Sequence, residues 1–193
     1  MIAELVLAGV LGYLLGAIPT GVLISRLLRA PDVRQQGSGH TGGLNVSRTA
    51  GLWAGVATGL VDALLGLAAV SGAALLTDNP WAVTAAGVMA VVGHNWSVFI
   101  GFEGGVGLST LVGALFRLSP LHTIGGLAIL ALFWLILVRL VRIRQARATI
   151  LTMAVICPLL WAFGLPWPTI LLGAIGGVMV ILKTLPDWNR LYD

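Results

Sequence analysis

Residues 51–77 read GLWAGVATGLVDALLGLAAVSGAALLT, and this stretch decides the class of fold. Asp62 is its only charged residue, and the run is longer than the roughly 20 residues with which an α-helix crosses a bilayer. Similar apolar runs lie on both sides of it, at 2–25, 80–99, 121–138, 148–164 and 167–183. A further run at 107–118 covers only about 18 Å as a helix. We expect it to be a tilted partner of a neighbouring span or a half-membrane segment.

The composition agrees with a chain whose solvent is lipid. Hydrophobic residues make up 58% of the 193 residues, charged residues only 9%, and the mean hydropathy is +1.00. Soluble domains carry about 25% charged residues. The 26 glycines would weaken soluble helices, but small residues let membrane helices pack closely. The sequence predicts an all-α polytopic membrane protein of about seven transmembrane helices, one of them short, with residues 1–193 forming a single integral membrane domain.

The basic residues predict the orientation of the chain. Ten of the eleven fall in the first loop, in the fifth loop or at the C-terminal end: Arg26, Arg29, Arg34, Arg48, Arg139, Arg142, Arg144, Arg147, Lys183 and Arg190. Basic residues gather on the cytoplasmic side of a membrane, so the N-terminus is expected outside and the C-terminus in the cytoplasm. The first run lacks a basic segment ahead of it, so we expect it to remain as a span rather than be cleaved as a signal peptide.

Several classes of function are disfavoured by the residues that are missing. The single cysteine, Cys157, lies in an apolar run and is interpreted as a packing residue. Histidines and cysteines do not cluster with the spacing of a metal site, so no metal is expected. Nucleic acid is not expected as a partner, because aromatic and basic residues do not interleave on any soluble segment. The basic cluster between the fifth and sixth runs is expected to contact anionic lipid head groups.

Two glycine-rich loops carry the functional signal. Residues 37–48 read GSGHTGGLNVSR, and residues 93–110 read GHNWSVFIGFEGGVGLST. Glycines let backbone N–H groups approach an anion closely, and serine, histidine, asparagine and arginine side chains add donors. The predicted topology puts both loops on the cytoplasmic face, where the short helix that begins near Gly107 offers its N-terminus to a phosphate. The alternative for the first loop is a flexible glycine linker.

The two loops resemble the motifs of the PlsY family of bacterial membrane acyltransferases, which move an acyl chain from acyl phosphate to glycerol 3-phosphate. The family's first motif reads approximately G-S-G-N-x-G-A-T-N-x-x-R, and its second approximately G-H-x-x-P-x-F-x-G-F-K-G-G-K-G-V-A-T. Residues 12–16 and 61–66 also resemble family positions. The resemblance spans essentially the whole chain and identifies it as a divergent member.

The resemblance implies seven spans, an outside N-terminus, chemistry at the cytoplasmic face of the bacterial inner membrane, and no metal or organic cofactor. It implies acyl phosphate and glycerol 3-phosphate as substrates and lysophosphatidate as product. By motif position, the catalytic residues are Ser38, Arg48 and His94. The substrate-binding residues are Gly37, Gly39, His40, Asn45, Gly104, Gly105 and Gly107.

Among the positions at which this chain departs from the family pattern are His40, Leu44, Glu103, Val106, Thr184 and Asp187. Glu103 and Val106 stand where the family has lysines, and the second of those lysines is expected to hold substrate phosphate. Thr184 and Asp187 replace a histidine and an asparagine of a third motif, which reads approximately R-H-R-E-N-I-x-R-L. A lost charge-assisted contact costs about 1.5–3 kcal/mol. Two added acids would further repel a bound anion.

The polar residues of the presumed site each allow a second interpretation. His40 is either a new general base or, as is commoner for a loop histidine, solvated. His94 is either a ligand-binding residue or a residue that caps backbone and meets lipid head groups, and His122 is expected at the outer interface. Asp62 lies inside the second span, where an acid suggests function. Its expected partner is Arg48 or a loop amide.

Three functions therefore remain open at this point. The chain is a working acyltransferase with altered phosphate contacts, a catalytically silent relative kept as a structural subunit of a larger membrane complex, or a related transferase or lipid-binding protein for another head group. Membrane lipids are expected partners in each case, and other subunits in the second. Because several charged contacts are lost together, we expect transfer to glycerol 3-phosphate to be absent or very weak compared with typical members.

Overall fold

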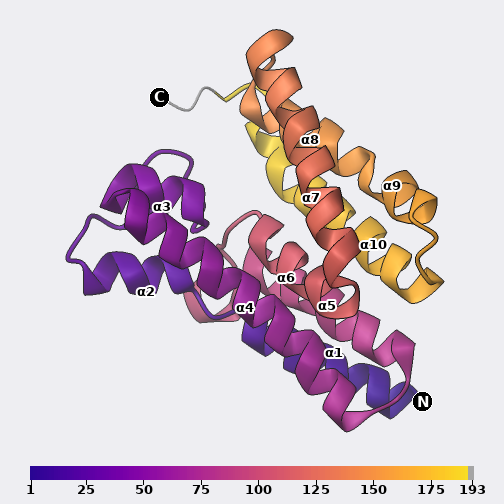
Figure 1. Cartoon of the computed structure of the whole chain (residues 1–193). Coiled ribbons are helices and arrows are strands. Elements are labelled where there is room, and N and C mark those ends of the chain that lie inside the picture. The colour runs from indigo at the N-terminus through magenta and orange to yellow at the C-terminus, as the bar shows by residue number, and fades with distance from the viewer. Residues whose placement is uncertain (191–193) are drawn as a thin grey trace.

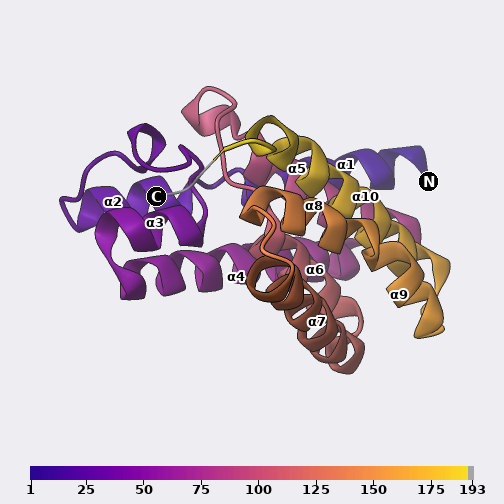
Figure 2. The same cartoon turned by 90° about the horizontal axis from the view of Figure 1, so that it is seen from above.

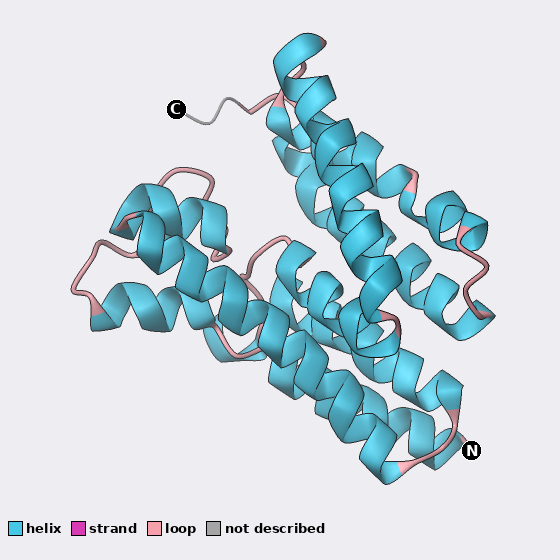
Figure 3. Cartoon of the chain, viewed as in Figure 1, coloured by secondary structure: helices cyan, strands magenta, loops and turns pink. Residues whose placement is uncertain are grey.

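A computed structural model describes residues 1–190, and in that part of the chain every regular element is a helix (Figures 1 and 3). The α-helices are α1 (Ile2–Gly16), α2 (Thr20–Leu27), α3 (Gly43–Ala50), α4 (Leu52–Leu76), α5 (Pro80–Asn95), α6 (Leu108–Leu118), α7 (Pro120–Leu135), α8 (Gln145–Ala154), α9 (Ile156–Ala162) and α10 (Trp167–Thr184). Short helical turns are η1 (Val33–Gln35), η2 (Val98–Ile100), the π-helical η3 (Ile136–Leu140) and η4 (Leu185–Asp187).

Five segments of the described residues are long and apolar enough to cross a membrane: Ile2–Leu27, Leu52–Leu76, Pro120–Leu140, Gln145–Ala162 and Trp167–Asp187. Each corresponds to one of the predicted runs. The run at 107–118 forms the shorter apolar helix α6, as expected. The run at 80–99 yields only the 16 residues of α5, which is too short to count among the five. The protein is therefore an all-helical integral membrane protein.

The predicted runs are continuous, whereas two of the helical segments are interrupted. The first breaks between α1 and α2, because Pro19 has no amide hydrogen to continue the backbone pattern. Ser97, from the loop after α5, donates its hydroxyl to the carbonyl oxygen of Ala17 at this break. The segment from Gln145 to Ala162 divides into α8 and α9 at Val155. The first break leaves the Ala17 carbonyl oxygen as an acceptor for Ser97, and hydropathy alone reveals neither break.

Small residues bring the inner helices close together. In α1, a Cβ added at Gly12 or Gly16 would lie about 2 Å from the backbone oxygen of Ala86 or Ala90 in α5. In α6, a Cβ at Gly113 would lie 1.8 Å from the carbonyl oxygen of Ala63 in α4. Such contacts are the usual means by which membrane helices associate, since lipid gives them no hydrophobic driving force. The glycines therefore fix the packing of α1 on α5 and of α4 on α6.

The helices form two groups in space. Figure 1 shows α1 to α6 on one side and α7 to α10 on the other, and Figures 1 and 2 both show α2 and α3 beside the start of α4. The buried core joins the groups through Val70, Val91, Leu111, Leu172 and Val180, which come from α4, α5, α6 and α10. Many outward side chains of α4 and α7 are exposed leucines and isoleucines, as expected for surfaces that face lipid.

Candidate functional site

A pocket of about 370 Å³ lies where the two glycine-rich loops meet α4, α6, α7, α8 and the last residue of α10. Its polar lining comes from Ser38, His40, Asn45, Ser47, Arg48, Asp62, His94, Ser109, Gln145, Thr149 and Thr184. Its apolar lining includes Leu44, Leu52, Val56, Val106, Leu108 and Trp134. The volume is within the range of small-ligand sites. The pocket thus combines polar side chains with apolar ones, among them Val56 of α4 and Trp134 of α7.

The first loop is held in shape by one buried side chain. The Asn45 amide donates to the carbonyl oxygens of Val33, Gln36 and His40 at 2.9–3.0 Å, and its oxygen accepts from the Ser38 amide at 3.1 Å. Gly37 adopts φ +53°, and a Cβ there would lie 2.3 Å from the Asn45 oxygen. The residue must therefore be glycine. The first loop is a folded structure and not a flexible linker.

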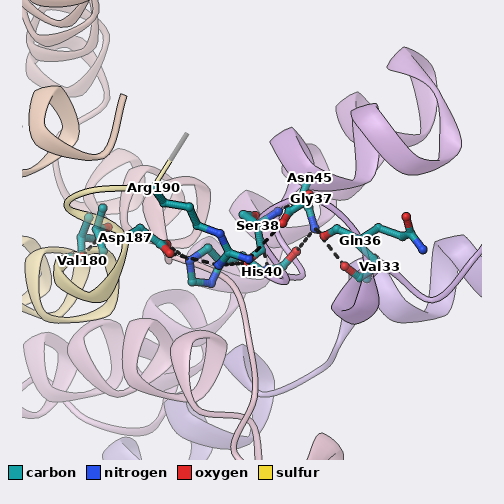
Figure 4. Close-up of polar contacts among 10 residues, drawn as sticks. Val33, Gln36, Gly37, Ser38, His40, Asn45, Val180, Asp187 and Arg190 are labelled. Atoms are coloured by element: carbon teal, nitrogen blue, oxygen red, sulfur yellow. Dashed lines mark hydrogen bonds and ion pairs between the residues drawn. The ribbon is translucent and has the colours of Figure 1, made fainter. Parts of the chain in front are cut away.

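Asp187 and Arg190, which follow α10, contact the first loop (Figure 4). His40 Nε2 lies 2.6 Å from the Asp187 carboxylate, and Arg190 Nη1 lies 3.2 Å from the other oxygen of that carboxylate. Arg190 also donates to the carbonyl oxygens of Ser38 and Gly37 at 2.9 and 3.2 Å. His40 is therefore not the solvated loop histidine of the commoner interpretation. Its side chain is only 16% exposed, because Asp187 covers it.

The second loop joins the first through its glycines. The Thr41 amide donates to the Gly104 oxygen at 3.3 Å, and the Gly105 amide donates to the His94 oxygen at 3.0 Å. A Cβ at Gly105 would lie 2.1 Å from His94 Nε2, so glycine is needed for the imidazole to lie against the backbone. Gly107, at φ +88°, ends this loop at the start of α6. The predicted convergence of the two loops is present in the structure.

Asp62 has other partners than those predicted. It is 1% exposed, accepts a hydrogen bond from the Thr20 hydroxyl, and lies 3.6 Å from His94 Nδ1. The expectation that it pairs with Arg48 or a loop amide is therefore wrong. Thr20 is the first residue of α2, directly after the break at Pro19. The break therefore places the Thr20 hydroxyl beside the Asp62 carboxylate. His94 is buried between Asp62 and the second loop, which removes the interpretation that it meets lipid head groups.

Arg48 reaches across the pocket to the other group of helices. Its Nη2 donates to Gln145 Oε1 at 3.1 Å, which links α3 to the start of α8. Gln145, Trp134 and Thr149 line the pocket and were not anticipated from the sequence. They lie outside the glycine loops in runs that read as ordinary membrane helix or basic loop, so the sequence carries no signal that singles them out.

The two added acids both have basic partners. Glu103 does not line the pocket: its side chain is 56% exposed and lies 3.0 Å from Arg34. Arg34 also bonds to Asp32 and lowers the pKa of that carboxyl to about 2. Asp187 is engaged by His40 and Arg190. Each acid is thus paired with a basic side chain, and the expected repulsion of a bound anion stays a prediction. Val106 does line the pocket, and there the lost lysine leaves an apolar wall.

The structure brings together most of the predicted site residues. Ser38, His40, Asn45, Arg48, His94 and Gly107 line the pocket. Gly37, Gly39, Gly104 and Gly105 do not line it and instead shape the two loops. Among residues 1–190, no group of three or more metal-ligating side chains gathers in a way that could hold an ion. The pocket offers one fixed cation, two imidazoles, several hydroxyls and the N-terminus of α6.

Comparison of this chain with known proteins points to one family, the glycerol-3-phosphate acyltransferases. A family profile for glycerol-3-phosphate acyltransferases matches residues 6–193. The "Glycerol-3-phosphate acyltransferase 2" of Moorella thermoacetica is 39% identical over 96% of this chain and 92% of its own length. A Synechococcus glycerol-3-phosphate acyltransferase is 42% identical over 96% of this chain and 88% of its own.

Solved structures give the same result for the fold. The crystal structure of PlsY in its lysophosphatidic acid form has a TM-score of 0.80 and 28% identity, and covers 96% of this chain and 90% of that one. The glycerol 3-phosphate form of PlsY has a TM-score of 0.78 and 29% identity over the same shares. Sequence and fold therefore agree that the chain belongs to the PlsY family of glycerol-3-phosphate acyltransferases.

Proposed function

We propose that this protein transfers an acyl chain from acyl phosphate to glycerol 3-phosphate and releases lysophosphatidate and inorganic phosphate. The observation that carries the proposal is the pocket in which both family loops meet Arg48 and the N-terminus of α6. Relatives about 40% identical over almost the whole chain are glycerol-3-phosphate acyltransferases, and PlsY binds glycerol 3-phosphate and lysophosphatidic acid in a similar fold.

The pocket has one set of residues suited to the phosphate group and another suited to the acyl chain. Arg48, the loop amides and the start of α6 supply donors and positive potential for phosphate. The apolar side formed by Leu52, Val56 and Trp134 suits a hydrocarbon chain that enters from the lipid between α4 and α7. Ser38 and His94 lie in the polar part, where the carbonyl carbon would be attacked. Val106 leaves this site with one cation fewer than the family pattern, so we expect weak phosphate binding.

We also propose that the chain crosses the bacterial inner membrane seven times as one domain, with its N-terminus outside and its C-terminus in the cytoplasm. The five long segments, together with α5 and α6 as the shorter crossings, give this count. Arg34, Arg48 and Arg190 lie beside the pocket or on its loops, and basic residues favour the cytoplasmic side. The pocket then faces the compartment that supplies soluble glycerol 3-phosphate.

The proposal is tested by assaying the purified full chain in detergent with acyl phosphate and glycerol 3-phosphate, and by changing Arg48. We expect Arg48→Gln to lower kcat/KM roughly 10- to 150-fold, the equivalent of losing one charge-assisted contact of about 1.5–3 kcal/mol. Arg139→Gln is the matched control, because Arg139 is exposed and does not line the pocket. Equal activities of the two variants would contradict the proposed phosphate site.

A silent lipid-binding relative is the second candidate, and Val106 is the observation that favours it. Without the lysine of the family pattern, the pocket is apolar where substrate phosphate is expected. Tight binding of lysophosphatidate by the purified chain, together with no acyl transfer at any substrate concentration, would support this candidate and exclude the first.

A further inference from the structure

Two of the positions at which this chain departs from the family pattern form a pair that no motif describes. His40 stands in the first loop and Asp187 in η4, 147 residues later, and their side chains meet at 2.6 Å (Figure 4). Both are shielded from solvent, with side-chain exposures of 16% and 6%. His40 also forms part of the pocket wall. Two simultaneous departures thus create one histidine–carboxylate dyad at the proposed site.

Both members of the dyad are fixed from outside. Arg190 holds the second oxygen of Asp187 at 3.2 Å and is itself tied to the carbonyl oxygens of Gly37 and Ser38. The His40 backbone is held by the Asn45 amide at its oxygen and by the Ser38 hydroxyl at its nitrogen. The imidazole therefore has a defined position and orientation before any substrate arrives. Preorganisation of this kind is what a catalytic group requires.

The carboxylate selects the tautomer of the imidazole. An ionised Asp187 can only accept a hydrogen bond, so the proton of a neutral His40 ring resides on Nε2. The lone pair is then on Nδ1. A carboxylate in this position also stabilises the imidazolium that forms when Nδ1 takes up a proton, as the aspartate of a serine-protease triad does. The dyad has the parts of a general base.

We propose that His40 is the general base of the acyl transfer in this chain, with Asp187 as its positioning residue; this inference rests on the proposed function. Nδ1 takes the proton of the acceptor hydroxyl while the hydroxyl oxygen attacks the carbonyl carbon of acyl phosphate. The new C–O ester bond forms, the C–O bond to phosphate breaks, and the leaving phosphate takes the proton back from His40. Alcohol and acyl phosphate thus become ester and hydrogen phosphate, and His40 is unchanged.

The first test is the kcat of His40→Asn, which removes the base. General-base catalysis contributes roughly 10²- to 10⁴-fold, so we expect kcat to fall by at least about 100-fold with little change in KM. His122→Asn is the matched control, because His122 lies on α7 beside Ser119 and does not line the pocket. A purely structural tie between the loop and η4 would be preserved in His40→Gln, whose Nε2 takes the place of the imidazole Nε2 as the donor to Asp187, so activity of His40→Gln within threefold of the unaltered chain would overturn the proposal.

The second test is chemical rescue. In His40→Gly, added imidazole should restore part of the lost rate, and in His40→Asn it should restore none, because the asparagine fills the space. Asp187→Asn should lower kcat by a similar factor, since an amide that donates to Nε2 leaves the proton on Nδ1. Absence of rescue in a His40→Gly protein with an unaltered thermal transition would contradict the role as base.

The third test does not depend on turnover. The chain has three histidines, so ¹⁵N-histidine labelling gives three pairs of ring signals, and His40→Asn identifies the pair of His40. We expect the proton of the neutral form of His40 to be on Nε2. A neutral ring protonated at Nδ1 would overturn the dyad as a base, whatever the activity.

Failure of this inference can be told apart from failure of the proposed function. Transfer to glycerol but not to glycerol 3-phosphate by the unaltered chain would remove the proposed function, and the dyad would stand if His40→Asn slowed that transfer equally. Transfer to glycerol 3-phosphate that His40→Asn leaves intact would remove the dyad alone. If the unaltered chain only hydrolysed acyl phosphate, releasing phosphate without transfer to any alcohol, the proposed function and the dyad would both be overturned.

Discussion

At the scale of single residues, Val106 and Glu103 both stand where the family has lysine, but they affect different parts of the protein. Val106 lines the pocket, so the lost ammonium group is missing where an anion would bind. Glu103 does not line the pocket and pairs with Arg34 at the protein surface. Surface ion pairs contribute little, typically ~0–1 kcal/mol. The first replacement therefore bears on substrate binding, and the second bears on the attachment of the loop.

Val106→Lys should lower the KM for glycerol 3-phosphate or acyl phosphate about tenfold, because it returns one charge-assisted contact to the pocket. Steady-state kinetics on the purified variant measure this. Glu103→Lys is the control, since the same side chain is then introduced three residues earlier and outside the pocket. A KM that falls in the control and not in Val106→Lys would show that long-range charge, and not a contact, governs binding.

At the scale of helices, close packing of glycines positions the loops. α6 approaches α4 at Gly113 and Gly66, and a Cβ at either position would lie within about 2 Å of backbone atoms. α6 begins at the second loop, and α4 follows the first loop through α3. The contact between α4 and α6 therefore sets the distance between the two loops that form the pocket.

Gly113→Ala should destabilise the protein by at least about 1–3 kcal/mol, the usual cost of overpacking, because α6 must move away from α4. Thermal unfolding in detergent, followed by the fluorescence of the seven tryptophans, measures the change. Gly125→Ala in α7 is the control: a Cβ there meets no atom within 4 Å, and alanine favours a helix by about 1 kcal/mol over glycine. Destabilisation of the control instead would contradict this explanation.

At the scale of the whole molecule, the site belongs to both groups of helices. The first and second loops come from the group α1 to α6, whereas Gln145, Thr149 and Thr184 come from the other group. Arg48 bonds to Gln145 across the pocket, and Arg147 holds the Trp188 carbonyl oxygen at 3.1 Å. The pocket therefore depends on the two groups keeping a fixed separation.

The proposed topology predicts which side of the membrane each loop occupies. After Cys157 is replaced by alanine, single cysteines at Ser38, Glu103 and Arg142 should react with a membrane-impermeant reagent only from the cytoplasmic side. A cysteine at Asp78, between α4 and α5, should react only from outside. Labelling of position 103 from outside alone would remove the seven-span topology and the cytoplasmic site together.

Much of the fold follows from the sequence, because helix placement in a membrane depends on the length of apolar runs. Each predicted run became a helical segment, and the convergence of the two loops followed from counting spans. The pairing of His40 with Asp187 did not follow, since each residue alone looks like a lost contact. The partners of Asp62 were missed for a similar reason: Thr20 reaches it only because Pro19 interrupts the first helix.

The contact of Arg190 with the first loop has a consequence for biosynthesis. The ribosome delivers Ser38 152 residues before the arginine that binds its carbonyl oxygen, so most of the chain enters the membrane while the loop lacks its cover. Asp187 arrives equally late, and His40 has no carboxylate partner until then. A nascent or prematurely terminated chain thus inserts most of its helices without these contacts, and the proposed dyad of His40 and Asp187 forms only after η4 has been synthesised.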